Sequence, residues 1–246
     1  MIRLAAITML WAGMACAQPT GVAEPLRIGT ESDFAPYIAM NDAGQREGYD
    51  VDLMAAICER GPYDCTWVEQ PFSDLFTGLD AGAYDIVIGG VGNTPDRAQF
   101  ADWTAPYRHV ETGRSSFAAL SDKIDPRDVK VSVQVGTLQE TELRKRGYDV
   151  VTYPSNTSAL QAMLNGEIPV FFATVGYLQE IERNIDAKLF NLGDLTYPES
   201  GPQIGVQKTQ TDLLVRLNEI LADLAEDGTL DRLELRWFPS RKGKGT

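Results

Sequence analysis

The chain has 246 residues, of which 43% are hydrophobic, so it is long enough for one large domain or two small ones. Its formal net charge is -13 at pH 7. A surface this acidic disfavours non-specific contact with nucleic acid and with anionic membrane surfaces, so we expect neither as a partner.

The first 17 residues predict a secretory signal peptide. Arg3 supplies a positive charge, residues 4–12 form an apolar run, and residues 15–17 are a small-residue cleavage site. A lipoprotein anchored through Cys16 is the alternative, although Gly13 stands where a branched aliphatic residue is expected. No other run reaches the roughly 20 apolar residues that span a bilayer. We therefore expect an exported protein.

The first half of the mature chain predicts a βαβαβ unit. We expect strands over residues 26–30, 65–69 and 84–90, and helices over 49–59 and 72–81, with loop and turns over 32–45. Apolar residues at helical spacing, such as Leu53, Met54 and Ile57, support the first helix. This order of elements is typical of a parallel sheet with right-handed crossovers.

Cys58 and Cys65 are the two cysteines that remain after cleavage. An even pair in an exported chain favours a disulfide, and closing so short a loop stabilises a fold by about 2–3 kcal/mol. A metal site is the alternative, but it needs more ligands, and His109 is the only histidine of the chain. We expect no metal and no cofactor.

A single arginine, Arg97, follows the short apolar strand 86–88 and its glycine-rich turn. Ligands of open α/β sheets lie beyond the carboxyl ends of the strands, and an arginine there grips a carboxylate through two parallel hydrogen bonds. The alternative is a structural arginine paired with Asp96, with Asp102 or with a helix end. The turn lacks the residues of a phosphate-binding loop, and the chain has no GxSxG or HExxH motif. The sequence therefore predicts a site for a small anion.

A second βαβαβ unit follows, with strands over 129–135, 149–153 and 168–172 and helices over 138–146, 156–165 and 175–185. A late strand over 204–207 and helices over 213–226 and 230–237 complete the pattern. We expect lobe 1 to comprise residues 24–110 plus 203–240, and lobe 2 residues 111–202, with a disordered tail over 241–246. The crossings near 109–114 and 199–203 would form a hinge beside an interlobe cleft.

Six motifs carry a family resemblance: LRIGTESDFAPY, GYDVDLMAAICERGPYDCTWVEQPFSDLF, YDIVIGGVGNTPDR, DWTAPY, VQVGTLQE and LAEDGTLDRLELRWF. With them the chain resembles the periplasmic solute-binding proteins of polar amino-acid ABC importers (bacterial extracellular solute-binding proteins, family 3), in particular the lysine/arginine/ornithine-, histidine- and opine-binding branch. The resemblance implies an α/β, two-lobed periplasmic-binding-protein fold, each lobe a mostly parallel sheet flanked by helices, joined by a two-segment hinge. It also implies a monomeric, non-enzymatic protein of the periplasm that delivers a solute to an ABC permease in the inner membrane.

The resemblance also implies roles for individual residues. Arg97 matches the residue that binds the ligand carboxylate, and Glu31 matches an acid that faces the distal cation of the ligand. Phe34 and Phe72 match aromatic residues that sandwich the ligand. Gly90, Gly92 and the turn at Thr137 match positions that contact it. Simpler roles are a surface acid or cap for Glu31, core packing for the phenylalanines and a helix cap for Thr137.

Three departures from the family pattern concern the ligand. Thr174 stands where the family has the aspartate that binds the amino group, and Gly89, Gly90 and Gly92 replace hydroxyl residues. Leu138 replaces a second threonine. We expect a carboxylate ligand whose amine is absent, secondary or recognised elsewhere, with Thr174 lining the site or only filling space.

Two other functions remain open at this point. The fold resembles periplasmic cyclohexadienyl dehydratases, in which case Glu31 or Glu167 would serve as the acid. It also resembles accessory proteins of periplasmic quinoprotein dehydrogenases.

Overall fold

The computed structural model describes residues 23–110 and 112–238. The predicted signal peptide (1–17) and the predicted tail (241–246) lie outside these residues. Each predicted helix is present, and the largest difference is that the last helix of the second unit ends at Ile181 rather than at residue 185. The helices are α1 (Tyr49–Arg60), α2 (Leu75–Asp80), α3 (Leu138–Lys145), α4 (Asn156–Leu164), α5 (Val175–Ile181), α6 (Thr211–Glu226) and α7 (Thr229–Trp237), and a 3-10 helix, η1 (Phe72–Asp74), precedes α2.

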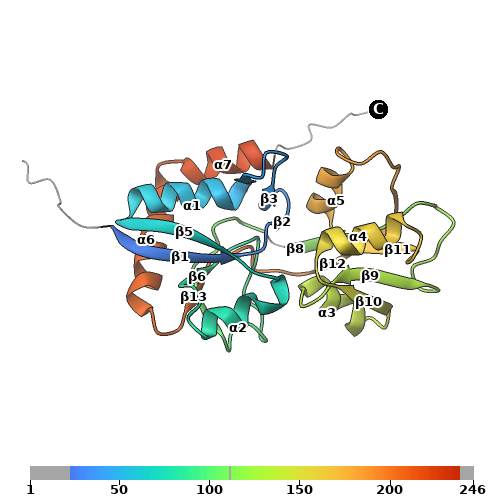
Figure 1. Ribbon diagram of the computed structural model, residues 1–246, viewed down its shortest axis with the longest axis horizontal. Helices are drawn as coiled ribbons and strands as arrows, with labels where there is room; N and C mark the ends of the chain where they lie inside the picture. Colours follow the sequence, from blue (N-terminus) through green and yellow to red (C-terminus); the bar gives the residue numbers. More distant parts are fainter. Residues whose placement is uncertain (1–22, 111, 239–246) are drawn as a thin grey trace, which may run out of the picture.

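The first sheet has the strand order β5-β1-β6-β13-β7 (Figure 1). Its strands are β1 (Glu24–Thr30), β5 (Tyr63–Glu69), β6 (Ile86–Val87), β7 (Ala101–Trp103) and β13 (Gly205–Gln207). Strand β1 pairs in parallel with β5 and β6, whereas β13 runs antiparallel to both of its neighbours. The sheet is therefore mostly parallel, and its carboxyl edge is the edge where Glu31 follows β1.

Side chains of β1 alternate between two cores. Leu26 and Ile28 are buried against residues of α1, α6 and α7, while Gly29, on the other face, lies against the ring of Tyr84 in the core that contains α2. Successive side chains of a strand point to opposite faces of the sheet, and both faces of β1 are covered. Burying each such aliphatic side chain contributes about 1.5–3 kcal/mol, which holds the edge of the sheet in a fixed place.

The second sheet has the strand order β10-β9-β11-β8-β12. Its strands are β8 (Thr112–Ala119), β9 (Lys130–Gln134), β10 (Asp149–Tyr153), β11 (Val170–Thr174) and β12 (Phe190–Pro198). Only β8 runs against the other four strands of this sheet. Helices α4 and α5 pack on one face and α3 on the other, so this sheet repeats the layered design of the first.

Strands β7, β8 and β12 were not among the predicted elements, and neither was a small sheet of β2 (Asp33–Phe34), β3 (Ile38–Met40) and β4 (Arg46–Glu47) in the predicted loop 32–45. Strand β8 reads TGRSSFAA and β12 reads FNLGDLTYP, so small, polar and turn-forming residues obscure the alternation of a strand. Pairing holds them: the Ser115 hydroxyl and the Tyr197 hydroxyl lie 2.6 Å apart across the two strands.

The chain passes between the two sheets twice. It leaves the first sheet after β7 and enters the second at β8, and it returns from β12 to β13. Figure 1 shows both connections in the middle of the molecule. The expected lobe boundaries at 110/111 and 202/203 fall within these two connections, and the bending point itself stays a prediction.

The predicted disulfide between Cys58 and Cys65 is confirmed. It joins the last turn of α1 to β5, with 6.2 Å between the two Cα atoms. The bridge therefore fixes a helix of the first lobe to an edge strand of its sheet.

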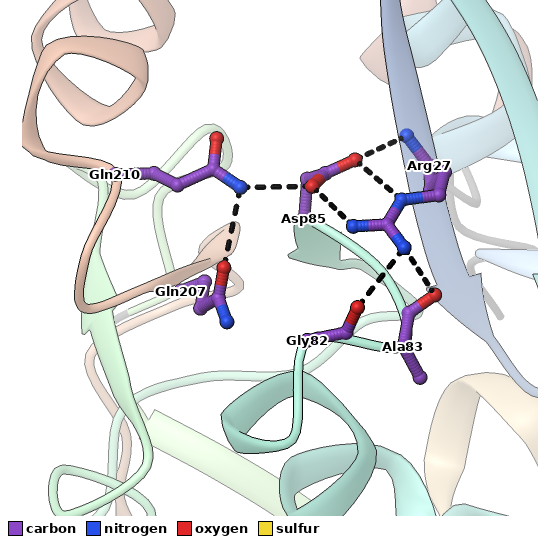
Figure 2. Close-up of polar contacts among 6 residues, drawn as sticks. All are labelled: Arg27, Gly82, Ala83, Asp85, Gln207 and Gln210. Atoms are coloured by element: carbon purple, nitrogen blue, oxygen red, sulfur yellow. Dashed lines mark hydrogen bonds and ion pairs between the residues drawn. The ribbon is translucent and has the colours of Figure 1, made fainter.

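A polar network joins β1 to the residues just before β6 (Figure 2). Asp85 accepts hydrogen bonds from the backbone N–H of Arg27 at 2.8 Å, from its Nε at 3.1 Å and its Nη2 at 2.8 Å, and from Gln210 Nε2 at 2.8 Å. Arg27 Nη1 also donates to the carbonyls of Gly82 and Ala83. Desolvation opposes the charge of Asp85, but the bonds from Arg27 prevail and lower its pKa. This acid and this arginine satisfy each other within the protein.

Candidate ligand-binding site

A cavity of about 1080 Å³ lies between the two sheets. The first lobe contributes the residues after β1, the start of α2 and the segment 89–97, and the second contributes the ends of β9 and β11 and the start of α3. Both connections between the lobes also line it. All eight predicted ligand-binding residues border this one cavity: Glu31, Phe34, Phe72, Gly90, Gly92, Arg97, Thr137 and Thr174.

Arg97 is buried in the wall of this cavity, with 9% of its surface exposed. Its Nη1 donates to the Gly92 carbonyl at 3.0 Å, and its Nη2 lies 3.4 Å from the Gly136 carbonyl of the second lobe. Its guanidinium carbon lies 5.3 Å from the ring centre of Phe72 and 4.8 Å from that of Phe76. The guanidinium is therefore placed by carbonyls and rings.

No acidic partner neutralises Arg97 within residues 23–110 and 112–238: neither Asp96 nor Asp102 forms an ion pair with it. Desolvation lowers the pKa of Arg97 to about 10, while Glu199 and then Asp96 favour its charge from a distance. The side chain thus stays cationic at neutral pH. A buried cation without a paired acid is costly, and a carboxylate bound in the cavity would relieve that cost.

The turn before Arg97 requires its glycines. Gly90 has a φ of +63°, and its N–H donates to the buried carboxylate of Asp50 at 2.7 Å. A Cβ atom on Gly90 would lie 2.7 Å from the ring of Phe34 and 2.8 Å from that of Tyr37. The turn therefore presents backbone rather than side chains to the cavity.

Glu31 lies at another part of the cavity wall, beside the second lobe. One of its carboxylate oxygens accepts a short hydrogen bond from Gln134 Nε2, and the other lies 3.4 Å from the Phe72 N–H. Desolvation raises its pKa to about 7 against the opposing bond from Gln134, with the nearby Asp33 adding to the rise. A neutral amide, not a cation, therefore holds this acid.

The two phenylalanines border the cavity, but both contact protein rings. Phe34 lies nearly parallel to Tyr37, with ring centres 5.5 Å apart, and to Tyr177 of the second lobe at 6.3 Å. Phe72 meets Phe76 edge to face at 6.3 Å. The aromatic sandwich around a ligand stays a prediction, and Phe72 has the additional role of covering the guanidinium of Arg97.

Both threonines cap helices at the cavity wall. The Thr137 hydroxyl accepts from the Glu140 N–H at 3.2 Å at the start of α3, and the Thr174 hydroxyl accepts from the Tyr177 N–H at 3.3 Å at the start of α5. These caps fix the helix starts. The simpler capping role is therefore present at both positions, and a contact with ligand stays a prediction.

Among the polar side chains that border the cavity, Gln134, Asn156 and Glu199 were missed in the sequence. Gln134 is 2% exposed, and its Oε1 accepts from Asn156 Nδ2 at 2.9 Å; Glu199 comes from the second connection between the lobes. Gln134 sits in a strand and Asn156 at a helix start, where polar residues have ordinary structural explanations. No spacing in the sequence pairs residue 199 with residue 97.

The lobes also touch beside the cavity. The carboxylate of Asp33, after β1, accepts from the Thr157 N–H at 2.8 Å and from its hydroxyl at 2.6 Å. Thr157 lies in the first turn of α4, where free N–H groups attract an acid. Together with the bond between Glu31 and Gln134, this contact joins the segment after β1 to the second lobe.

Within the described residues, no group of three or more histidine, cysteine or acidic side chains is arranged to hold a metal ion, and no helix combines the length and apolarity needed to cross a membrane.

Comparisons with known proteins identify the family of the chain. A model of the bacterial extracellular solute-binding proteins, family 3, matches residues 26–240. The lysine/arginine/ornithine-binding periplasmic protein of Escherichia coli K12 is 29% identical over 232 residues, which cover 87% of this chain and 88% of that protein.

Two solved structures are also similar. A periplasmic His/Glu/Gln/Arg/opine family-binding protein from Silicibacter pomeroyi, in complex with lysine, has a TM-score of 0.81 and 28% identity, with 89% of this chain and 99% of that chain covered. An ancestral amino acid-binding protein, a precursor of cyclohexadienyl dehydratase, has a TM-score of 0.75 and 25% identity over 87% of this chain and 95% of that one.

Proposed function

This chain belongs to the bacterial extracellular solute-binding proteins, family 3, and on that premise we propose that it captures a small, carboxylate-bearing, amino-acid-like solute and delivers it to an ABC importer. The relatives named above are periplasmic binding proteins, which supports the periplasm as its location. The proposed partners are the solute and an inner-membrane ABC permease, with the protein acting as a monomer.

The observation that carries this proposal is the guanidinium of Arg97. It is buried in the wall of the interlobe cavity and has no ion-pair partner among the described residues. Inside a protein such a cation is stabilised by a bidentate carboxylate. A solute that supplies the carboxylate completes the site, and a solute without one leaves the cation uncompensated.

The proposed mechanism is binding followed by closure of the two lobes. Arg97, the glycine turn and Phe72 offer the first contacts, and the start of α3 and Thr174 then close over the ligand. Closure excludes water and strengthens each polar contact. The bonds from Gln134 to Glu31 and from Thr157 to Asp33 already join the lobes and would help to hold them together once closed. The ligand shifts the equilibrium only by its greater affinity for that arrangement.

A thermal-shift screen tests this function. Purified protein is heated with amino acids, opines, ectoine-like solutes and simple organic acids, and each shift is followed by calorimetric titration. A ligand at 100 times its Kd adds about 2.7 kcal/mol of stability, which gives a clear shift. We expect the active compounds to share a free carboxylate. A panel in which no carboxylate stabilises the protein would contradict the proposal.

One observation favours a second function. The carboxyl of Glu31 borders the cavity with a pKa raised to about 7, which suits a general acid at neutral pH, and one similar structure is a precursor of a dehydratase. A cyclohexadienyl-dehydratase-like protein would turn over prephenate or arogenate and lose that activity in Glu31→Gln. We expect no turnover; measurable activity that depends on Glu31 would replace the binding function with the enzymatic one.

A further inference from the structure

Glu199 is an acid of the cavity wall that favours the charge of Arg97 from a distance. It belongs to the connection from β12 back to β13 and lines the same cavity as the guanidinium. Among acids, it exerts the strongest favourable effect on the charge of Arg97, ahead of the adjacent Asp96. Glu31, by contrast, is held by Gln134 and has no comparable effect on Arg97.

The Glu199 carboxylate lies over the same face of the second sheet as Thr174, one diagonal position away. Strand β11 pairs with β8 so that Thr174 lies opposite Ser115. Gly113 is two residues from Ser115 and faces the same side of the sheet. A Cβ on Gly113 would lie 2.6 Å from Glu199 Oε2, so this oxygen sits over a diagonal neighbour of Thr174, a separation of about 7–8 Å between such positions.

Gly92 brings the same connection against Arg97. The Gly92 carbonyl accepts from Arg97 Nη1, and a Cβ on Gly92 would lie only 2.9 Å from the Gly201 carbonyl. Any side chain at position 92 would push the connection away from the cavity. Glycine at this position therefore lets the segment that carries Glu199 approach the guanidinium.

No basic side chain pairs with Glu199 in the ranges that the structure describes. Arg108, which attracts it from a distance, is itself engaged by Glu234 in two hydrogen bonds of 2.6 and 3.0 Å and by the Tyr37 hydroxyl. Desolvation raises the pKa of Glu199, with Arg108 and Arg97 opposing. Among the described residues, the cavity wall thus contains a cation, Arg97, with no acid in contact, and an acid, Glu199, with no cation in contact.

We infer that Glu199 binds the cationic nitrogen of the ligand next to the carboxylate held by Arg97. This inference rests on the proposed function and specifies its ligand class: a zwitterion with a primary or secondary ammonium adjacent to a carboxylate. Thr174, whose hydroxyl caps α5, adds at most a neutral contact to that ammonium. The charges of the ligand and of the cavity then match in pairs, which leaves neither buried charge alone.

Isothermal titration with two probe pairs tests the inference. L-lysine is compared with 6-aminohexanoate, and L-arginine with 5-guanidinopentanoate; each second compound lacks only the α-amine. Wild-type protein should prefer the α-amino compound of a pair. Glu199→Gln should weaken binding of that compound by about 10- to 100-fold and leave its partner nearly unchanged, so that the preference collapses. A merely structural role would weaken both compounds alike.

Two further variants sharpen the result. Asp96→Asn removes an exposed acid next to Arg97 and should leave the preference intact. Thr174→Asp, added to Glu199→Gln, places a carboxylate on the neighbouring position while keeping a residue that caps α5, and should restore the preference.

The possible failures are distinguishable. Wild-type binding with an unchanged preference in Glu199→Gln, or with no preference for the α-amine, would overturn this inference and leave the binding function standing. A wild-type protein that binds none of the four probes and no carboxylate in the thermal-shift screen would contradict the proposed function, and this inference with it.

Discussion

Two arginines of the first lobe have opposite surroundings. The side chain of Arg27 is 44% exposed, yet Asp85 and two carbonyls bind it completely (Figure 2). Arg97 is only 9% exposed and has no acid in contact within the described residues. Burial makes an unpaired charge more expensive, so a purely structural design would pair Arg97 first. The contrast fits the proposed binding site, in which the carboxylate of a ligand would supply the acid that Arg97 lacks among these residues.

Two acids repeat the contrast. Asp85 meets an arginine, and its pKa is lowered. Glu31 meets a neutral amide, and desolvation raises its pKa to about 7. The folded protein therefore stabilises the charged form of Asp85, whereas it disfavours the charged form of Glu31.

The largest expected effect is the loss of ligand affinity when Arg97 is replaced. Arg97→Ala should weaken binding of the tightest ligand from the screen by about 2–5 kcal/mol, because the ligand carboxylate loses its buried partner. The free energy of unfolding without ligand should not fall comparably, since no native ion pair is lost. Calorimetric titration and chemical denaturation measure the two quantities. Arg60→Ala, which removes an ion-paired arginine of the same lobe, is the control; equal affinities in both variants would refute the role of Arg97.

A smaller effect is expected in the pH dependence of Glu31. Because its folded pKa is raised, the folded state binds the proton more tightly; this stability is fully present below about pH 4.5 and is lost as pH rises through about 7. Wild-type protein without ligand should lose about 1–3 kcal/mol relative to Glu31→Gln between pH 4.5 and 7.5. Denaturation across this range measures it, with the exposed Glu167→Gln as control. Parallel profiles for wild type and Glu31→Gln would contradict the shift.

The contribution of Asp85 to stability should depend on pH in the opposite way. Asp85→Asn should lower the free energy of unfolding by about 1–2 kcal/mol at pH 7, a value reduced because water reaches Arg27. Since the folded pKa of Asp85 is lowered, its contribution is present above the unfolded value near 3.9 and disappears on acidification. The two proteins should therefore converge below about pH 3. Ligand affinity should be unchanged, and Asp80→Asn, an exposed acid at the end of α2, should have little effect on either quantity.

The smallest expected effect concerns the aromatic rings that lie near the guanidinium of Arg97. Phe72→Leu keeps an apolar side chain but removes the ring 5.3 Å from the guanidinium carbon, and it should weaken ligand binding by about 0.5–1 kcal/mol. Titration measures this difference. Phe190→Leu, which removes a ring under Lys188 far along the second sheet, serves as the matched control and should bind like wild type.

Regular hydrophobic spacing made the helices and most strands predictable, because α1 and α6 bury one clear apolar face. The strands β8 and β12 were not predictable, since their small, polar and turn-forming residues hide the apolar alternation, and their pairing with each other is visible only in the fold. Arg97 could be selected because its place after a buried strand has a physical meaning. Glu199 could not, because its approach to the guanidinium depends on how the second connection folds over Gly92.

The parts of the chain from which each lobe is built have a consequence for folding during synthesis on the ribosome. Strand β13 lies between β6 and β7, and α6 and α7 complete the core around β1, so this lobe needs segments from near both termini. The second lobe uses one uninterrupted stretch from β8 to β12. Its pairings close shorter chain loops and are the faster to form. An emerging chain can therefore complete its middle before its beginning.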